Sequence, residues 1–102
     1  MRIEFVRSGG FAGMRLTCNV DTSDLPREQA SNLDKLVSDA GFFELPETLA
    51  PKSPMPDRFE YRLTVDGAGQ SHSVVVSDAA APESLRPLLN YLTTLAIAGK
   101  NR

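Results

Sequence analysis

The chain has 102 residues, a formal net charge of −2 and one cysteine, Cys18. This length predicts a single domain, residues 1–102, that can bury one modest core without disulfides. The weak negative charge argues against a nucleic-acid binder, and no stretch approaches the ~18 apolar residues of a membrane span. Because Cys18 has no partner for an intrachain disulfide, and because Glu4 and Arg7 interrupt any secretory apolar run, we expect a cytoplasmic protein.

Four segments alternate apolar and polar residues with a period of two, which is typical of half-buried strands. In the third of them, Phe59, Tyr61 and Leu63 face one way and the polar residues between them face the other. Glycine-rich links at 9–13 and 67–69 join the strands in pairs, which predicts two hairpins. The four segments are residues 1–5, 14–21, 58–66 and 71–77.

Two further segments carry apolar residues at helical spacing. The first covers residues 26–40, with Pro26 suited to a first helical position and Gly41 suited to the residue just past the end. The second covers residues 82–98. Because Pro87 would break a helix interior, we expect this helix to begin near Ser84, with Pro87 still in its first turn.

The resulting order, β-β-α-β-β-α, predicts an α+β fold with a four-stranded antiparallel sheet and two helices on one face. The polar outer sides of the strands indicate that only one face of the sheet is covered. Following the chain up and down through this fold brings three irregular segments to one end of the sheet. They are the glycine-rich tip at 9–13 and the segments 42–57 and 78–82.

The sequence offers little that could carry catalysis. The one histidine, His72, lies between Ser71 and Ser73, which point to the opposite face of a strand and so cannot meet its ring. One histidine and one cysteine cannot supply the three or four ligands of a zinc site. Cys18 falls on the inward side of its strand, where a core thiol with a raised pKa is expected. We therefore expect no enzyme activity, no metal and no cofactor.

The tip at residues 8–13 is harder to explain by structure alone, because a hairpin turn needs glycine but has no need of Phe11 at its crest. An exposed phenylalanine there could anchor an interface by filling a partner's pocket. It could equally fold back over the end of the sheet and cover the core. The residues alone leave both possibilities open.

The run of residues 5–13 that contains this tip resembles the opening of the emfourin family, which are small bacterial protein inhibitors of thermolysin-like zinc metalloproteases such as protealysin. The resemblance continues through residues 37–46, 57–65 and 85–89, in order, over nearly the whole chain. It implies a cytoplasmic protein whose partner is a thermolysin-like metalloprotease. The individual contact residues of the family do not carry over from it.

Topology and resemblance together predict that the tip and the neighbouring loops occlude the active-site cleft of the protease, without chelating its zinc. We expect a monomer when free, with no nucleic-acid or membrane partner. The alternative is a binding module without inhibitory activity, an adaptor of a bacterial complex, that uses the same end of the sheet or adds a strand at an exposed sheet edge. The predicted partner-binding residues are Arg7, Ser8, Gly9, Gly10, Phe11, Ala12, Gly13, Pro56, Asp57 and Arg58.

Replacing Phe11 tests whether its ring is an interface anchor. Phe11→Ala is expected to weaken inhibition of a thermolysin-like protease by about 2 kcal/mol or more, as loss of an anchor does. Thermal unfolding should change little, because an exposed ring contributes little to the core. The inhibition constant and the melting temperature are to be measured side by side. An alanine variant with full potency would exclude the anchor.

Overall fold

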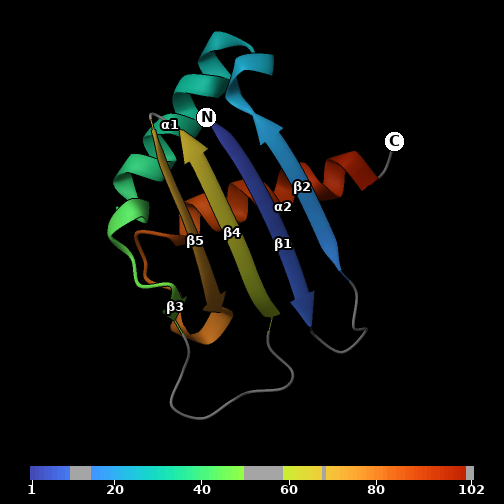
Figure 1. Cartoon of the computed structure of the whole chain (residues 1–102). Helices are drawn as coiled ribbons and strands as arrows, with labels where there is room; N and C mark the ends of the chain where they lie inside the picture. The colour runs from blue at the N-terminus through green and yellow to red at the C-terminus, as the bar shows by residue number, and fades with distance from the viewer. Residues whose placement is uncertain (10–14, 50–58, 68, 101–102) are drawn as a thin grey trace.

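The computed structural model describes residues 1–9, 15–49, 59–67 and 69–100, and these residues form an α+β domain with a five-stranded mixed sheet (Figure 1). The strands follow the order β2-β1-β4-β5-β3 across the sheet. All neighbouring pairs are antiparallel except β3 and β5, which run parallel. The strands are β1 (Arg2–Gly9), β2 (Leu16–Asp21), β3 (Thr48–Leu49), β4 (Phe59–Gly67) and β5 (Gln70–Ser77).

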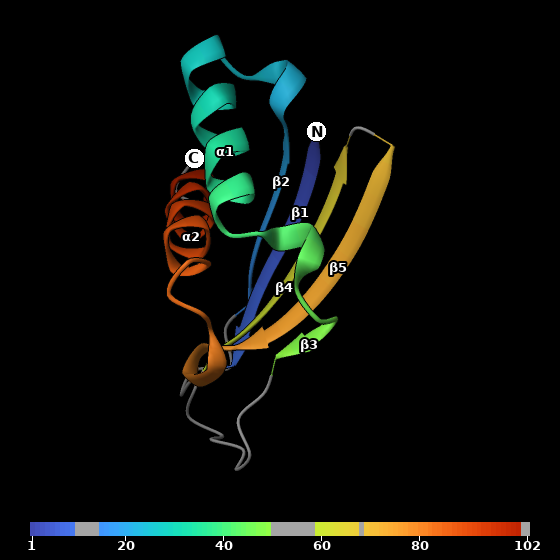
Figure 2. The same ribbon diagram turned by 90° about the vertical axis from the view of Figure 1, so that its left-hand side faces the viewer.

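Both helices, α1 (Arg27–Asp39) and α2 (Arg86–Lys100), cover the same face of this sheet (Figure 2). The core between the layers contains the inward residues of the alternating strands, as predicted. Neither helix in the described part of the chain is both long and apolar enough to cross a membrane. The largest fully buried side chains are Ile3, Phe5, Leu33, Phe42, Leu63, Val65, Val74, Val76, Leu85, Leu88 and Leu92.

The ends of the helices follow the predicted signals closely. The first helix starts directly after Pro26, and Gly41 adopts the left-handed conformation (φ 60°) that terminates helices and that favours glycine. The second helix begins at Arg86, two residues later than expected, after a turn in which the Leu85 and Arg86 amides both donate to the Pro82 carbonyl. Pro87 is its second residue, where the missing N–H costs no helical hydrogen bond.

The prediction of four antiparallel strands is wrong in one respect, because it omits β3. This strand is two residues long, and it lies in the segment 42–57 that was treated as a loop. Thr48 and Leu49 pair with Val75 and Val76, and the amide of Val75 donates to the Glu47 carbonyl at 2.8 Å. Two residues are too few to show the alternation that reveals a strand, so only the structure identifies this edge.

The side chain of His72 holds the chain that leads into β3 against the sheet. Its Nε2 lies 2.7 Å from the carbonyl oxygen of Leu45, which can only accept, so Nε2 carries the proton. The imidazole also meets the ring of Phe42 edge-on, with 5.5 Å between centroids. As a result, the 3₁₀ turn Phe42–Glu44 lies beside β5 near His72, the third residue of that strand, and not at the end of the sheet where the whole of segment 42–57 was expected.

Replacing His72 tests this attachment. In His72→Phe the ring contact with Phe42 remains, but the hydrogen bond to Leu45 is lost, which should lower the free energy of unfolding by about 1 kcal/mol. Because β3 would then detach more often, hydrogen exchange at the Val75 amide should accelerate more than exchange at the Leu63 amide in β4. Equal exchange rates in the variant and the parent protein would contradict this role.

Candidate partner-binding rim

The end of the sheet at which β1 and β5 finish and β4 begins is the part of the fold that the sequence predicted to bind a partner, and we refer to it as the rim. Gly9 pairs with Phe59 there, and Glu60 pairs with Ser77. The 3₁₀ turn Asp78–Ala80 (η3) follows directly, and β3 also runs toward this end, because Leu49 pairs with Val76. The convergence predicted for the tip strand and for residues 78–82 is therefore confirmed.

Of the predicted partner-binding residues, the structure describes Arg7, Ser8 and Gly9, which form the last three positions of β1. Gly10, Phe11, Ala12 and Gly13 lie outside the described residues, as do Pro56, Asp57 and Arg58. Their role in binding remains a prediction. Segment 10–14 directly follows β1, and segment 50–58 directly precedes β4, so the described ends of these two strands form the base of the predicted site.

At the base of the rim, the guanidinium of Arg7 stacks on the ring of Phe59, with its central carbon 4.2 Å from the ring centroid. The register explains the contact: Arg7 stands opposite Tyr61, and Phe59 is the diagonal neighbour on the same face of the sheet. The residue directly opposite Phe59 is Gly9, which has no side chain to compete for the ring. Such a cation–π contact is worth about 0.5–2 kcal/mol, depending on how far it is desolvated.

This stack connects the ends of β1 and β4, the two strands that adjoin the segments predicted to bind the partner. Arg7 lies three residues before segment 10–14, and Phe59 directly follows segment 50–58. The sequence marked Arg7 as a partner contact, but its described contact is with Phe59 of the same chain. Phe59 was predicted only as an inward strand residue, and no sequence signal connects it to Arg7, because their contact depends on the register between β1 and β4.

A second cluster fixes η3 against the start of α2. The Nη2 of Arg86 donates to the backbone carbonyl of Asp78 at 3.1 Å, and the Nη1 of Arg86 lies 3.7 Å from the Asp78 carboxylate. Burial raises the pKa of Tyr61, and the charge and hydrogen bonding of Asp78 raise it further, whereas Arg7 acts in the opposite direction. The two clusters thus meet at Tyr61, and together they connect β1, β4, η3 and α2 at the rim.

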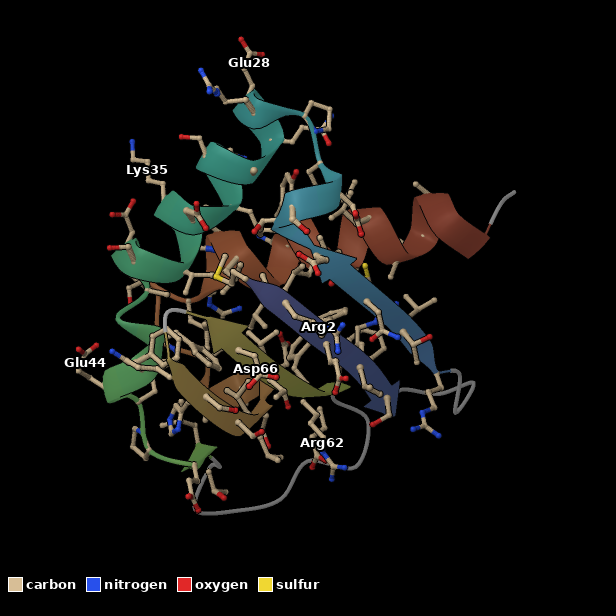
Figure 3. All side chains as sticks on the ribbon, turned by 45° about the horizontal axis from the view of Figure 1, so that its top comes forward. Arg2, Glu28, Lys35, Glu44, Arg62 and Asp66 are labelled. Atoms are coloured by element: carbon tan, nitrogen blue, oxygen red, sulfur yellow. The ribbon has the colours of Figure 1, made fainter. Side chains whose placement is uncertain are left out.

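No helix of the described residues covers the opposite face of the sheet, and this face is charged and polar. Arg2, Arg62 and Asp66 project from it (Figure 3). Near the rim this face has a shallow hollow of about 260 Å³. The hollow borders the predicted contact residue Ser8, and charges of both signs surround it. It is lined by Val6, Ser8, Arg15, Glu60 and Arg62.

The residues considered for catalysis have structural partners. His72 is engaged with Leu45, while Ser73 faces the opposite side of β5 and shares a 2.8 Å hydrogen bond with Thr64. Cys18 is half-buried against the core, and burial raises the pKa of its thiol, as predicted. Within the residues that the structure describes, no group of three or more histidine, cysteine or acidic side chains could hold a metal ion.

Comparison with known proteins yields one family and one similar structure. The model of the family described as Emfourin matches residues 5–93 of this chain. A similar solved structure is emfourin (M4in) from Serratia proteamaculans, described as an M4 family peptidase inhibitor. The two chains are 23% identical, the similarity covers 85% of this chain and 83% of the other, and the TM-score is 0.48. No curated protein sequence matches.

Titration of Tyr61 tests the geometry of the rim clusters. In a Tyr91→Phe background, which leaves Tyr61 as the one tyrosine, Asp78→Asn should lower the pKa of Tyr61 toward about 10, its ordinary value. Arg7→Met should raise it further, because a stabilising positive charge is removed from beside the phenolate. The absorbance of the phenolate is to be followed against pH. Shifts of the same sign in both variants would contradict the arrangement.

The raised pKa of Tyr61 also sets the sign of its effect on stability. The folded protein holds the phenolic proton more tightly than the unfolded chain does, so the contribution of this proton is complete below about pH 10. It is lost as the pH rises through the pKa of the folded state. In the same background, Asp78→Asn should bring the pKa of Tyr61 in the folded state closer to its value in the unfolded chain. The free energy of unfolding should then fall over a narrower range of alkaline pH, as measured by denaturant unfolding at a series of pH values.

Proposed function

The chain belongs to the Emfourin family, whose model spans residues 5–93, and we propose that it inhibits a thermolysin-like (M4-family) metallopeptidase by occluding the active-site cleft with the tip at residues 8–13. The family is one of peptidase inhibitors and not of enzymes. The Serratia protein is described as an M4 family peptidase inhibitor, and the proposed target class follows that description. The observation that carries the proposal is the family match, which includes every described residue of the rim clusters.

The rim supports a mechanism of occlusion because its base is held by several independent contacts. A projection blocks a cleft with less loss of conformational entropy when the elements that carry it are already fixed. Here the Arg7–Phe59 stack joins the strand that leads into the tip to the strand that leaves segment 50–58. The Asp78–Arg86 contacts fix the neighbouring turn in the same way.

In this proposal the tip supplies the contact and the rim supplies its support. Phe11 fills the apolar pocket that thermolysin-like enzymes offer beside the scissile bond, and Gly10 and Gly13 allow close approach of the backbone to the cleft wall. Ser8 and Gly9 adjoin the tip, while Pro56, Asp57 and Arg58 contact the adjacent lobe. Arg7 acts chiefly through Phe59. The inhibitor blocks access to the zinc without ligating it, because the tip carries no thiolate or imidazole.

A peptidase assay tests the proposal. The protein is mixed at increasing molar ratio with a thermolysin-like peptidase and with an unrelated zinc peptidase, and the residual activity of each is measured. We expect activity of the first enzyme alone to fall, toward zero at saturation. Arg2→Gln serves as a control, because Arg2 is exposed at the opposite end of β1 and should leave inhibition unchanged. Undiminished activity at a large excess would instead favour the alternative of a binding module without inhibitory activity.

A further inference from the structure

The two edges of the sheet differ in how they are protected against pairing with another strand. Natural proteins shorten exposed edges, place charges or proline in them, or cover them. The edge formed by β3 is only two residues long. The edge formed by β2 is six residues long, and its interior, from Leu16 to Val20, contains no charge and no proline. On the other side of the sheet, β3 pairs with Val75 and Val76, and the segment around Phe42 and Leu45 packs on His72, so the edge of β5 is partly covered. Among the described residues, β2 has no strand beside it on its outer edge over its whole length.

The helix layer extends beyond this edge. α2 crosses behind the sheet, and its C-terminal part continues past β2 (Figure 1). On this part of the helix Leu95 is only half-buried, and Ile97 is 45% exposed as the one large exposed apolar side chain among the described residues. A strand added beside β2 would therefore come to lie under a helix that is already in place.

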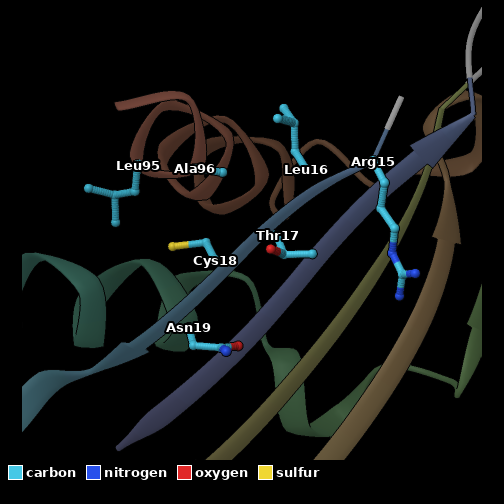
Figure 4. A pocket seen from close by; sticks show the side chains of 7 residues that line it. All are labelled: Arg15, Leu16, Thr17, Cys18, Asn19, Leu95 and Ala96. Carbon is cyan, nitrogen blue, oxygen red and sulfur yellow. The ribbon is translucent and has the colours of Figure 1, made fainter. Parts of the chain in front are cut away.

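A groove runs between β2 and this end of α2, with a volume of about 510 Å³ (Figure 4). Its apolar part is formed by Leu16 and Cys18 on the inward side of β2 and by Leu95 and Ala96 on the helix. The side chain of Cys18 lies on the same side of β2 as Leu95 and Ala96 (Figure 4). The groove is large enough for the inward side chains of an added strand. It is lined by Arg15, Leu16, Thr17, Cys18, Asn19, Leu95 and Ala96.

A second copy of this chain fits the edge poorly. Antiparallel pairing of β2 with itself around Cys18 would match Arg15 with Asp21 of the other copy and would satisfy both charges. However, the two-fold axis would also bring the overhanging end of the second α2 over the same groove. The groove can therefore hold a single added strand but not a second copy of α2. This favours an extended segment of a different protein as the occupant.

We propose that the edge of β2 binds an extended segment of another protein as a sixth strand, antiparallel to β2 and covered by the end of α2. The backbone of β2 supplies the hydrogen bonds, and the groove accepts apolar side chains opposite Leu16 and Cys18. A third apolar side chain of the segment lies opposite Val20, beyond the groove. The charges at its ends set the direction: a basic residue of the segment lies opposite Asp21, and an acidic residue lies opposite Arg15. This surface lies along the side of the sheet and meets the rim only at Arg15, which also lines the hollow beside Ser8.

Cys18 allows the register to be tested directly. The probe is a seven-residue peptide with the sequence lysine, valine, threonine, cysteine, threonine, valine and glutamate. Its cysteine, at position four, is activated as a 2-pyridyl disulfide. The Cys18 thiolate attacks the peptide sulfur, the Cys18–peptide disulfide forms and pyridine-2-thiol leaves, so no other oxidant is needed. In the matched control peptide, the activated cysteine and the threonine at position three are exchanged, which places the cysteine on the outer side of the strand.

Full-length protein is incubated with each peptide, and the adduct is followed by mass spectrometry. The peptide with the central cysteine should react at least about tenfold faster than the control, because binding in register raises the local concentration of its disulfide. A peptide with valine in place of the cysteine at position four should cause NMR chemical-shift changes that centre on the amides of β2. Equal rates for the two peptides, or shift changes centred elsewhere, would overturn the proposal.

A charge exchange supplies a second, independent readout. Arg15→Glu should slow capture of the peptide that ends in glutamate and accelerate capture of one that ends in lysine, with both activated at position four. Because Arg15 is exposed, the variant should fold as the parent protein does. A charge preference that stays the same in the variant would contradict the assigned direction. These measurements do not involve inhibition of a peptidase, so they test strand binding at β2 independently of the proposed function.

Discussion

The sheet buries one face only, and α2 supplies most of the cover for that face. Leu88 and Leu92 of this helix, and Leu85 directly before it, are fully buried above the inward residues of the strands. Because the helices occupy one side, the other side stays open and polar. Because α2 lies across the strands and not along them, its C-terminal part passes the edge of β2 (Figure 1), while Arg86 at its start contacts η3 at the rim. The groove beside β2 is therefore a consequence of how this helix is laid on the sheet.

The sequence predicted most of the sheet because alternation is a property of single strands. It predicted the ends of α1 because Pro26 and Gly41 act locally. It missed β3, whose two residues are too few to alternate, and it misplaced the chain around Phe42, which depends on a contact with His72 on a distant strand. Such features depend on pairing between segments, and the sequence of either segment alone does not carry that information.

The candidate site shows the same division. Convergence of the rim segments followed from counting strand directions, and the structure confirms it for β1 and for the turn after β5. The stack of Arg7 on Phe59 required the register between β1 and β4, and the contact of Arg86 with Asp78 required the path of the chain around η3. The prediction of Arg7 as a partner contact stays a prediction, and the structure adds its contact with Phe59 of the same chain. The assignment of the tip residues and of Pro56 to Arg58 remains a prediction.

The pairing of β1 with β4 at the centre of the sheet has a consequence for how the domain forms. The first hairpin emerges early from the ribosome, but its central neighbour is encoded beyond the middle of the chain and its cover lies near the C-terminus. Contacts between such distant segments close late and slow the folding of a domain. During synthesis, the apolar side of that hairpin therefore stays exposed to solvent until nearly the whole polypeptide has been made. A nascent chain released before its last helix would expose this surface to aggregation.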